Sequence, residues 1–211
     1  MEAKGRDVLA KDRILDKAEE LFAQNGYFAV SIRQITAAAE CNLAAVNYHF
    51  GNKKNLYLEV FRLRWIPRAR RIHDTFIGIL GTKNEPSLRD ILHSLATAFI
   101  EGPLTDDERE RHHQLIAREL AKPIGGLDIV ASQIHQPFFN ELSDLVKECL
   151  PEGQNEQELM LKLFSVFSML TFFNFSRELV TIITNYQYDQ AFKARLVNHI
   201  ADFCSLGIAY K

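Results

Sequence analysis

One stretch of this chain, residues 31–53 (SIRQITAAAECNLAAVNYHFGNK), limits the possible fold more than any other. Ser31 is followed three residues later by Gln34, which is the capping-box pattern that begins a helix. Apolar residues then recur at helical spacing, and Asn42 is a second N-cap candidate about ten residues on. The stretch therefore predicts two short helices joined by a tight turn, which is a helix-turn-helix.

The second of these helices has two different sides. Val46 and Phe50 lie four residues apart on one side, as buried residues do. The other side is small at its beginning and polar or aromatic further along, and the second helix of a helix-turn-helix enters the DNA major groove. Small side chains allow close approach to the duplex, and polar ones reach phosphates. The residues expected to contact DNA are Ser31, Arg33, Asn42, Ala44, Ala45, Asn47, Tyr48, His49 and Lys53, although Arg33 fits an ordinary surface position equally well.

Residues 11–56 resemble the N-terminal domain of the TetR family of transcriptional regulators. The resemblance rests on ILDKAEELFAQNGY, SIRQIT and NLAAVNYHFGNKKNLY, of which the last is the most specific. Two positions depart from the family pattern, because Glu40 stands where the turn commonly has Gly and Asn47 where an aromatic residue is frequent. The resemblance implies an all-α fold of about nine helices, with a three-helix DNA-binding domain over 1–56 and a helical ligand-binding and dimerisation domain over 57–211.

Charge is distributed unevenly, although the formal net charge is only −2. Residues 1–71 contain 13 Lys or Arg against 8 Asp or Glu, whereas residues 72–211 contain 12 against 19. A basic front and an acidic rear indicate that DNA contact is confined to one end of the chain.

The cysteines and the hydropathy pattern indicate the compartment. Cys41, Cys149 and Cys204 are far apart and show no metal-ligand spacing, so we expect no disulfide, no metal site and no cofactor. The polar start MEAKGRDVLAKDR does not resemble a secretory signal. The longest apolar run, 163–175, is interrupted by polar residues and falls short of the roughly 18 residues that a membrane span needs. We therefore expect a cytoplasmic protein without a membrane partner.

Glycine and proline residues mark the expected helix ends. A first helix over 11–24 should end at Gly26 in a left-handed cap. Pro67 should kink or stop the helix that Asn52 caps, and Pro137 should kink a helix over 128–150. The arginines between 62 and 71 could face DNA, but a hinge with intramolecular ion pairs is the favoured interpretation.

The last two helices are the most apolar. Residues 159–175 are hydrophobic on every side, and such a helix must be covered on every side. The final helix, 189–206, repeats apolar residues at helical spacing. Together they fit an isologous four-helix interface between two identical subunits, as in the family. The residues expected at this interface are Leu163, Phe164, Phe167, Phe192, Leu196, Ile200 and Phe203.

The main functional hypothesis is a repressor that binds a pseudo-palindromic operator as a homodimer and is released by a small-molecule effector, as the resemblance implies. The Phe-rich interior favours an apolar or aromatic effector. Candidate effector contacts are Arg118, His135, Phe167, Asn174 and Arg177, although a surface or structural role is the favoured interpretation of the four polar residues.

Two other classes of function are alternatives. An enzyme would need a recognisable site, and the sequence has no nucleotide-binding Gly-rich loop, nucleophile elbow or HExxH motif. A helical adaptor that uses the helix-turn-helix only as a scaffold is the second alternative. The polar arrangement of Tyr48, His49 and Lys53 counts against it, because a protein-binding surface would more often be apolar there.

Overall fold

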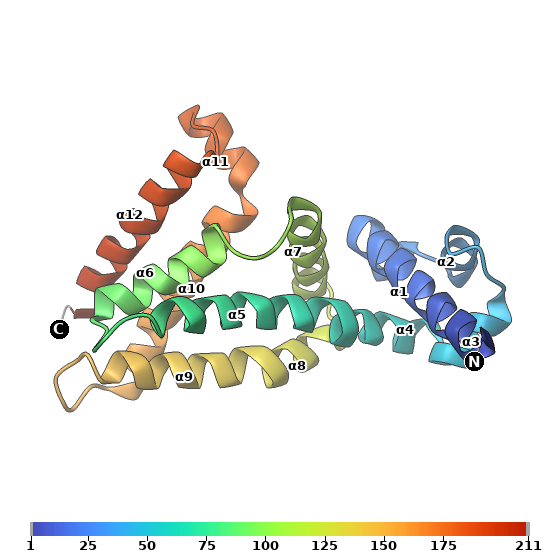
Figure 1. Cartoon of the computed structure of the whole chain (residues 1–211), viewed down its shortest axis with the longest axis horizontal. Helices are drawn as coiled ribbons and strands as arrows, with labels where there is room; N and C mark the ends of the chain where they lie inside the picture. The colour runs from blue at the N-terminus through green and yellow to red at the C-terminus, as the bar shows by residue number, and fades with distance from the viewer. Residues whose placement is uncertain (1, 210–211) are drawn as a thin grey trace. The chain divides into compact units, whose positions relative to one another are not determined.

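The computed structural model describes the backbone of residues 2–209 and the side chains of residues 10–209 (Figure 1). Throughout this range the regular structure is helical, without strands, which confirms the all-α fold. The chain packs into two compact units, which we call unit 1 (Met1–Ala69 with Leu104–Ile134) and unit 2 (Arg70–Pro103 with His135–Lys211). These are packing units, and the functional division at residue 56 stays a prediction.

Unit 1 contains the N-terminal helices and a later segment that returns to pack against α1. Its elements are α1 (Glu2–Ala29), α2 (Ile32–Ala38), α3 (Leu43–Phe50), α4 (Lys53–Val60), the π-helical segment η1 (Phe61–Trp65), the start of α5 (Ile66–Leu80), α7 (Asp106–Ala121), α8 (Gly126–Val130) and most of the π-helical segment η2 (Ala131–His135).

Unit 2 contains the remainder of α5 and the C-terminal helices. Its other elements are α6 (Leu88–Ile100), α9 (Gln136–Lys147), α10 (Glu156–Phe175), α11 (Arg177–Thr184) and α12 (Gln190–Ala209). Because α4, η1 and α5 follow without a break, as do α8, η2 and α9, residues 2–209 form ten helices, against about nine expected.

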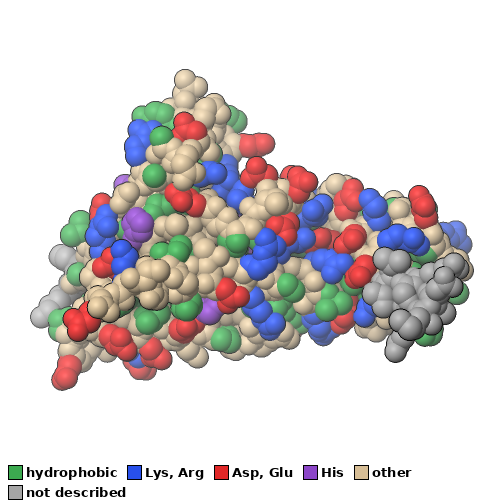
Figure 2. Space-filling view, viewed as in Figure 1, with side chains coloured by type: hydrophobic (Ala, Val, Ile, Leu, Met, Phe, Trp, Pro, Cys, Tyr) green, Lys and Arg blue, Asp and Glu red, His purple; other side chains and the backbone are tan. Residues whose placement is uncertain are grey.

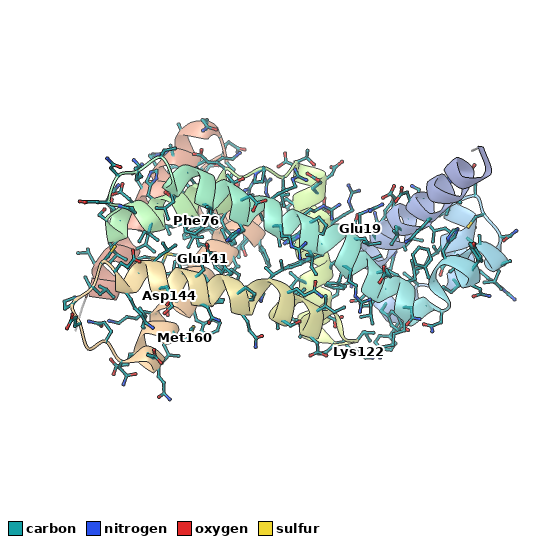
Figure 3. All side chains as sticks on the ribbon, turned by 60° about the horizontal axis from the view of Figure 1, so that its bottom comes forward. Glu19, Phe76, Lys122, Glu141, Asp144 and Met160 are labelled. Atoms are coloured by element: carbon teal, nitrogen blue, oxygen red, sulfur yellow. The ribbon has the colours of Figure 1, made fainter. Side chains whose placement is uncertain are left out.

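The core of unit 1 contains a row of packed aromatic rings among aliphatic side chains, together with a buried ion pair. Tyr57 of α4 lies between Phe22 and Phe61, with ring centroids 5.1 and 5.3 Å away in edge-on geometry. Glu19, labelled in Figure 3, receives two hydrogen bonds from the Arg68 guanidinium, the longer of them 3.0 Å. Both residues are buried, so this bidentate pair joins α1 to α5 within unit 1.

Unit 2 is built on α6, which packs against α12 and α10, while α9 lies beside α5 (Figures 1 and 3). His73 of α5 and Glu141 of α9 approach to 2.6 Å between Nε2 and Oε2, and Phe76 meets Phe138 edge-on. The buried residues of α6 and α12, such as Leu95 and Ile200, fill the space between these helices.

Neither internal proline stops its helix. A single residue separates each of Pro67 and Pro137 from a five-residue π-helical segment before it, and the helix continues past both prolines. A proline lacks the N–H of the α-helical ladder and its ring crowds the carbonyl four residues earlier. The wider π turn just before each proline is one of the known ways in which a helix accommodates such a disruption.

The first helix also differs from expectation. It begins at Glu2 rather than Lys11, and it breaks at Gly26, whose φ is 77° and ψ is 162°. The φ is positive as expected, but this combination is not the left-handed cap that we expected. It is an extended region of positive φ that is open essentially to glycine alone. One more helical turn, ending at Ala29, follows this break.

The buried side of α10 differs from the one expected. Leu163, Leu196 and Ile200 were expected at a dimer interface, but each is at most 5% exposed within the chain. This expectation is wrong because these three residues fill the core of unit 2 itself. Phe167 is half-buried among other rings, as is Phe192 beside Tyr188, whereas Phe164 and Phe203 are exposed.

One helix in the described range, α10, is long and apolar enough to cross a membrane by length and composition, with a mean hydropathy of 1.3. The helix is longer than the apolar run over 163–175, because it also includes a polar first turn that begins at Glu156. The buried core helix of a globular protein can be equally long and apolar, but only 28% of the apolar stretch of α10 is buried. It has an apolar side that the chain itself leaves open.

Candidate nucleic-acid interface

The helix-turn-helix of unit 1 begins with the predicted capping box. The Gln34 backbone N–H donates to Ser31 Oγ at 3.2 Å, and the Ser31 N–H donates to Gln34 Oε1 at 2.7 Å. At the other end of α2, the Glu40 N–H donates to the Ala37 carbonyl and the Cys41 N–H to the Thr36 carbonyl. These two bonds form a Schellman motif, whose central residue ordinarily is glycine. Glu40 fills it here with a φ of 49°.

Helix α3 presents one side to the core and the other to solvent. Asn42 caps it by accepting a 2.9 Å hydrogen bond from the Ala45 N–H. Val46 and Phe50 are buried, as their four-residue spacing predicted. Tyr48 is 77% exposed and meets the His49 ring edge-on at 5.0 Å. The helix is therefore held by its inner side while its outer side is accessible.

A tight turn at Gly51 links α3 to α4. The Asn52 N–H donates to the Phe50 carbonyl at 2.9 Å, and Gly51 has φ 77° and ψ −54°. This is the classic γ-turn, a rare and strained conformation that glycine adopts most readily. Asn52 then caps α4 by accepting from the Asn55 N–H at 2.9 Å.

Lys53 has a partner within unit 1. Its Nζ lies 4.2 Å from the centroid of the Tyr27 ring, which is a cation–π distance. Burial lowers the pKa of Lys53 from its usual value. The ammonium is thus positioned against the last helical turn of α1, which follows the break at Gly26.

None of the nine residues expected at the interface lies in the interior. Ser31, Arg33, Asn42, Ala44, Asn47 and Tyr48 are exposed, and Ala45, His49 and Lys53 are half-buried. The Ser31 hydroxyl and the Asn42 amide oxygen are engaged in capping their own helices. One further residue is exposed on the outer side of α3 and was not among the nine: Leu43, 51% exposed, with Asn47 four residues on. The same helical spacing that identified Asn47 could have identified it.

Three of the five arginines between 62 and 71, namely Arg62, Arg64 and Arg68, form ion pairs within unit 1, as the favoured interpretation expects, whereas the hinge stays a prediction. Arg62 lies 2.8 Å from Glu59, and Arg64 lies 2.9 Å from Asp16 and 3.4 Å from Asp12.

The residues expected at an effector site are divided between the two units. Arg118 belongs to unit 1, where its Nε donates to the Ala23 carbonyl at 2.6 Å and its Nη2 donates to the Gln24 carbonyl. Arg118 therefore satisfies carbonyls at the end of the first part of α1. These contacts fit the structural role that was the favoured interpretation of Arg118, and its place at an effector site stays a prediction.

The remaining four candidates lie in unit 2 as two pairs. His135 and Phe167 face each other with ring centroids 5.4 Å apart, in a cluster with Phe99, Phe138 and Phe139. Burial lowers the pKa of His135, which favours its neutral form at pH 7. Asn174 accepts a 2.9 Å hydrogen bond from Arg177, whose Nη2 also donates to the Ile100 carbonyl.

Two family models match this chain. Residues 14–60 match the model described as bacterial regulatory proteins, tetR family. Residues 85–208 match the model of the C-terminal domain of the HTH-type transcriptional dual regulator CecR. The two matches together cover the helix-turn-helix and nearly all of the helices that follow α5.

Known proteins of similar sequence are helix-turn-helix regulators. The dual regulator CecR of Shigella flexneri is 25% identical over 196 residues, which is 90% of this chain and 86% of the relative. The repressor Rv3405c of Mycobacterium tuberculosis is 35% identical over 148 residues, covering 68% of this chain and 61% of the relative.

Solved structures share the fold. The fatty acid degradation regulator FadR of Bacillus halodurans aligns with a TM-score of 0.64 at 15% identity, covering 96% of this chain and 97% of FadR. A TetR-like regulator of Rhodococcus sp. RHA1 aligns with a TM-score of 0.65 at 13% identity, covering 96% and 97%.

Proposed function

Because this chain belongs to the TetR family of transcriptional regulators, we propose that it is an effector-responsive repressor that binds a pseudo-palindromic operator as a homodimer. The observation that carries this proposal is the outer side of α3. Leu43, Ala44, Asn47 and Tyr48 are all exposed there, on a helix anchored by its buried inner side. A recognition helix needs this combination, since its backbone must be rigid while its side chains reach base edges.

The side chains of this surface suit distinct parts of a duplex. Asn47 can pair with an adenine edge, and Leu43 can contact a thymine methyl group. Tyr48 and Lys53 can reach phosphates, which position the protein without reading the sequence. The excess of Lys and Arg over Asp and Glu in residues 1–71 supplies the attraction, and affinity should fall with salt.

The proposed dimer uses the open side of α10 together with the end of α12. Leu161, Ser165, Ser168 and Phe172 are exposed at alternating spacings of four and three residues, the repeat typical of packed helix pairs. Phe203 and Leu206 are exposed on α12, which packs against α10. A twofold axis through these helices would give the isologous four-helix interface and set two α3 helices at a fixed spacing.

The proposed effector binds near the aromatic cluster of unit 2. His135 is the polar group within this cluster, and its neutral ring could accept or donate one hydrogen bond to an apolar or aromatic ligand. An effector acts only to the extent that it prefers the conformation that does not bind DNA.

Selection of bound duplexes from a random DNA pool tests the proposal. We expect enrichment of a site with twofold sequence symmetry, whose half-sites are centred about one helical turn apart or a multiple of it. No enrichment by a homogeneous sample would contradict DNA binding, and an asymmetric site would contradict the dimer.

The direction of control needs a separate experiment, because one relative is named a dual regulator and another a repressor. We place the protein in the cytoplasm, with the DNA it would regulate. Transcription in vitro from a promoter that contains the selected site should decrease when the protein is added, and an increase would contradict the repressor assignment.

A further inference from the structure

The break in α1 at Gly26 lies close to the start of the helix-turn-helix. The helical turn that ends at Ala29 and the buried Val30 separate it from Ser31, the N-cap of α2. The direction in which the chain leaves the break therefore decides where α2 begins. Glycine has little conformational preference of its own, so contacts from other helices must set this direction.

Two cations at the end of α7 contact the chain on both sides of the break. Before it, Arg118 donates to the carbonyls of residues 23 and 24, and a Cβ on Gly26 would lie 3.4 Å from the Arg118 Cδ. After it, the Nζ of Lys122, labelled in Figure 3, lies 3.9 Å from the centroid of the Phe28 ring. Four residues, about one helical turn, separate the two cations, so the end of α7 spans the break.

These two cations differ from many other charged side chains of unit 1. On the surface of unit 1 that Figure 2 shows, Lys and Arg side chains lie among Asp and Glu. Several of them form ion pairs, such as Arg64 with Asp16. Within the part of the chain that the structure describes, the partners of Arg118 and Lys122 are instead two carbonyls and a ring of α1.

The end of α7 is itself fixed in unit 1. Glu119, which directly follows Arg118, is buried and accepts hydrogen bonds from backbone N–H groups at the start of α8 and from the Tyr57 hydroxyl. The turn after the break has a second contact, since Lys53 of α4 lies over the Tyr27 ring. Because the end of α7 cannot shift without breaking the bonds of Glu119, its two cations hold the break at a fixed angle.

We infer that Arg118 and Lys122, which we call the α7 clamp, are positioning residues for operator recognition. They hold the break in α1 so that α2 and α3 have the orientation that base readout needs. The inference rests on the proposed DNA binding and adds a determinant that lies outside the helix-turn-helix and acts without contacting DNA. Base contacts require accurate placement of the recognition helix, whereas phosphate contacts carry no sequence information, so loosening the clamp should lower specific binding selectively.

The ratio of two affinities tests the clamp: that for the operator selected from the random pool, and that for an unrelated duplex of the same length. Fluorescence anisotropy with the full chain, without effector, measures both. Arg118→Ala should lower this ratio at least about 10-fold, which is the loss expected for one good base contact. Lys122→Ala, at an exposed position, should lower it in the same direction. Partial unfolding or the loss of one charge changes both affinities alike, so the ratio reports the orientation of the helix-turn-helix.

Conservative and matched variants complete the experiment. Arg118→Lys retains a cation that can donate to the same carbonyls and should restore most of the ratio. Arg109→Ala is the matched control, because Arg109 donates to the Leu104 carbonyl at 3.0 Å near the other end of α7 and should leave the ratio unchanged. Circular dichroism verifies folding, and Lys122→Ala decides the test if Arg118→Ala does not fold.

The possible results separate the clamp from the proposed function. A ratio that Arg118→Ala and Lys122→Ala leave unchanged, with both affinities lowered alike, would overturn the clamp and assign the two residues to stability or to phosphate contact. An equal fall of the ratio in Arg109→Ala would overturn it as well, because any weakening of α7 would then suffice. Wild-type protein that prefers no duplex to another would contradict the proposed function itself, and with it the clamp.

Discussion

The positive φ of Glu40, in the turn between α2 and α3, lowers the stability of the folded chain. A non-glycine residue in the left-handed region costs about 1–2 kcal/mol, and glycine there avoids it but loses part of the gain through a more flexible unfolded chain. We expect Glu40→Gly to raise the free energy of unfolding by about 0.5–1 kcal/mol, measured by urea denaturation. Ala38→Gly, at the last residue of α2, should instead lower it, by up to about 1 kcal/mol. A loss of stability in Glu40→Gly would mean that the Glu40 side chain stabilises the turn.

Lys53 has two possible roles, which a salt titration separates. If its ammonium also contacts a phosphate, Lys53→Ala should weaken binding to every duplex about equally and reduce the slope of log affinity against log salt by about one. Lys53→Arg should keep the slope. Tyr27→Leu removes the ring beneath the ammonium but leaves the charge, so the slope should also stay. An unchanged slope in Lys53→Ala would mean that Lys53 contacts no phosphate and that its role is the cation–π contact with Tyr27.

The junction between α7 and α8 depends on one buried carboxylate. Glu119 Oε1 accepts hydrogen bonds from the backbone N–H groups at the start of α8, those of Ile124 and Gly125 both at 2.8 Å, and Oε2 accepts from the Tyr57 hydroxyl at 2.7 Å. Glu119→Gln should lower the free energy of unfolding by about 2–3 kcal/mol, because charge-assisted bonds are replaced in a buried site. Tyr57→Phe, which removes a single bond, should cost about 1 kcal/mol.

The same carboxylate should make stability depend on pH. Burial raises the pKa of Glu119, but the hydrogen bonds from Tyr57 and from the backbone N–H groups lower it more, so the net pKa is below its usual value. A carboxyl with a lowered folded-state pKa stabilises fully above its unfolded value of about 4.3, and this contribution is lost as the pH falls through the folded value. The stability difference between wild type and Glu119→Gln should therefore be largest at neutral pH and shrink in acid. A constant difference from pH 7 to pH 3 would contradict this role.

Local signals in the sequence predicted local structure well. Ser31, Asn42 and Asn52 cap the helices they were expected to cap, because an N-cap needs only a side-chain oxygen and N–H groups two or three residues away. The side of α3 that faces solvent was predicted correctly from the spacing of Val46 and Phe50, which are four residues apart and buried. The π turns before Pro67 and Pro137 did not follow, because sequence shows that a proline disrupts the helical ladder but not which neighbouring bonds rearrange.

Non-local packing was predicted less well. Residues 159–175 are apolar on every side, so periodicity gave no means of choosing which side of α10 faces the core of unit 2. Leu163 was consequently assigned to the dimer interface and Leu161, which is 67% exposed, was not. Arg118 was assigned to an effector site because its sequence gives no indication that carbonyls of residues 23 and 24 lie beside it.

Dimerisation should control operator binding by the whole molecule. Phe203→Asp places a charge at a 58% exposed position of the proposed interface and should give monomers in sedimentation experiments. Each monomer then binds one half-site without the effective concentration that a linked second half supplies, so operator affinity should fall about 100-fold or more. Leu120→Asp, an equally non-conservative change outside that interface, should leave both properties unaltered. A Phe203→Asp dimer of normal affinity would place the interface elsewhere.

Effector and operator should each lower the protein's affinity for the other by the same factor. If an apolar or aromatic compound binds unit 2 and prefers the conformation that does not bind DNA, it lowers operator affinity by a ratio fixed by that preference. Thermodynamic linkage then requires the operator to lower effector affinity by the same ratio, commonly 5- to 150-fold. A gel-shift screen finds such a compound, and calorimetric titration with and without saturating operator measures the second ratio.

His135→Phe keeps a ring in the cluster but removes its hydrogen-bonding group. This variant should bind the compound more weakly in both measurements, while its DNA binding without effector is retained. Unequal ratios would mean that the compound competes for DNA or alters the dimer equilibrium instead, and an unaffected His135→Phe variant would place its binding site away from the aromatic cluster.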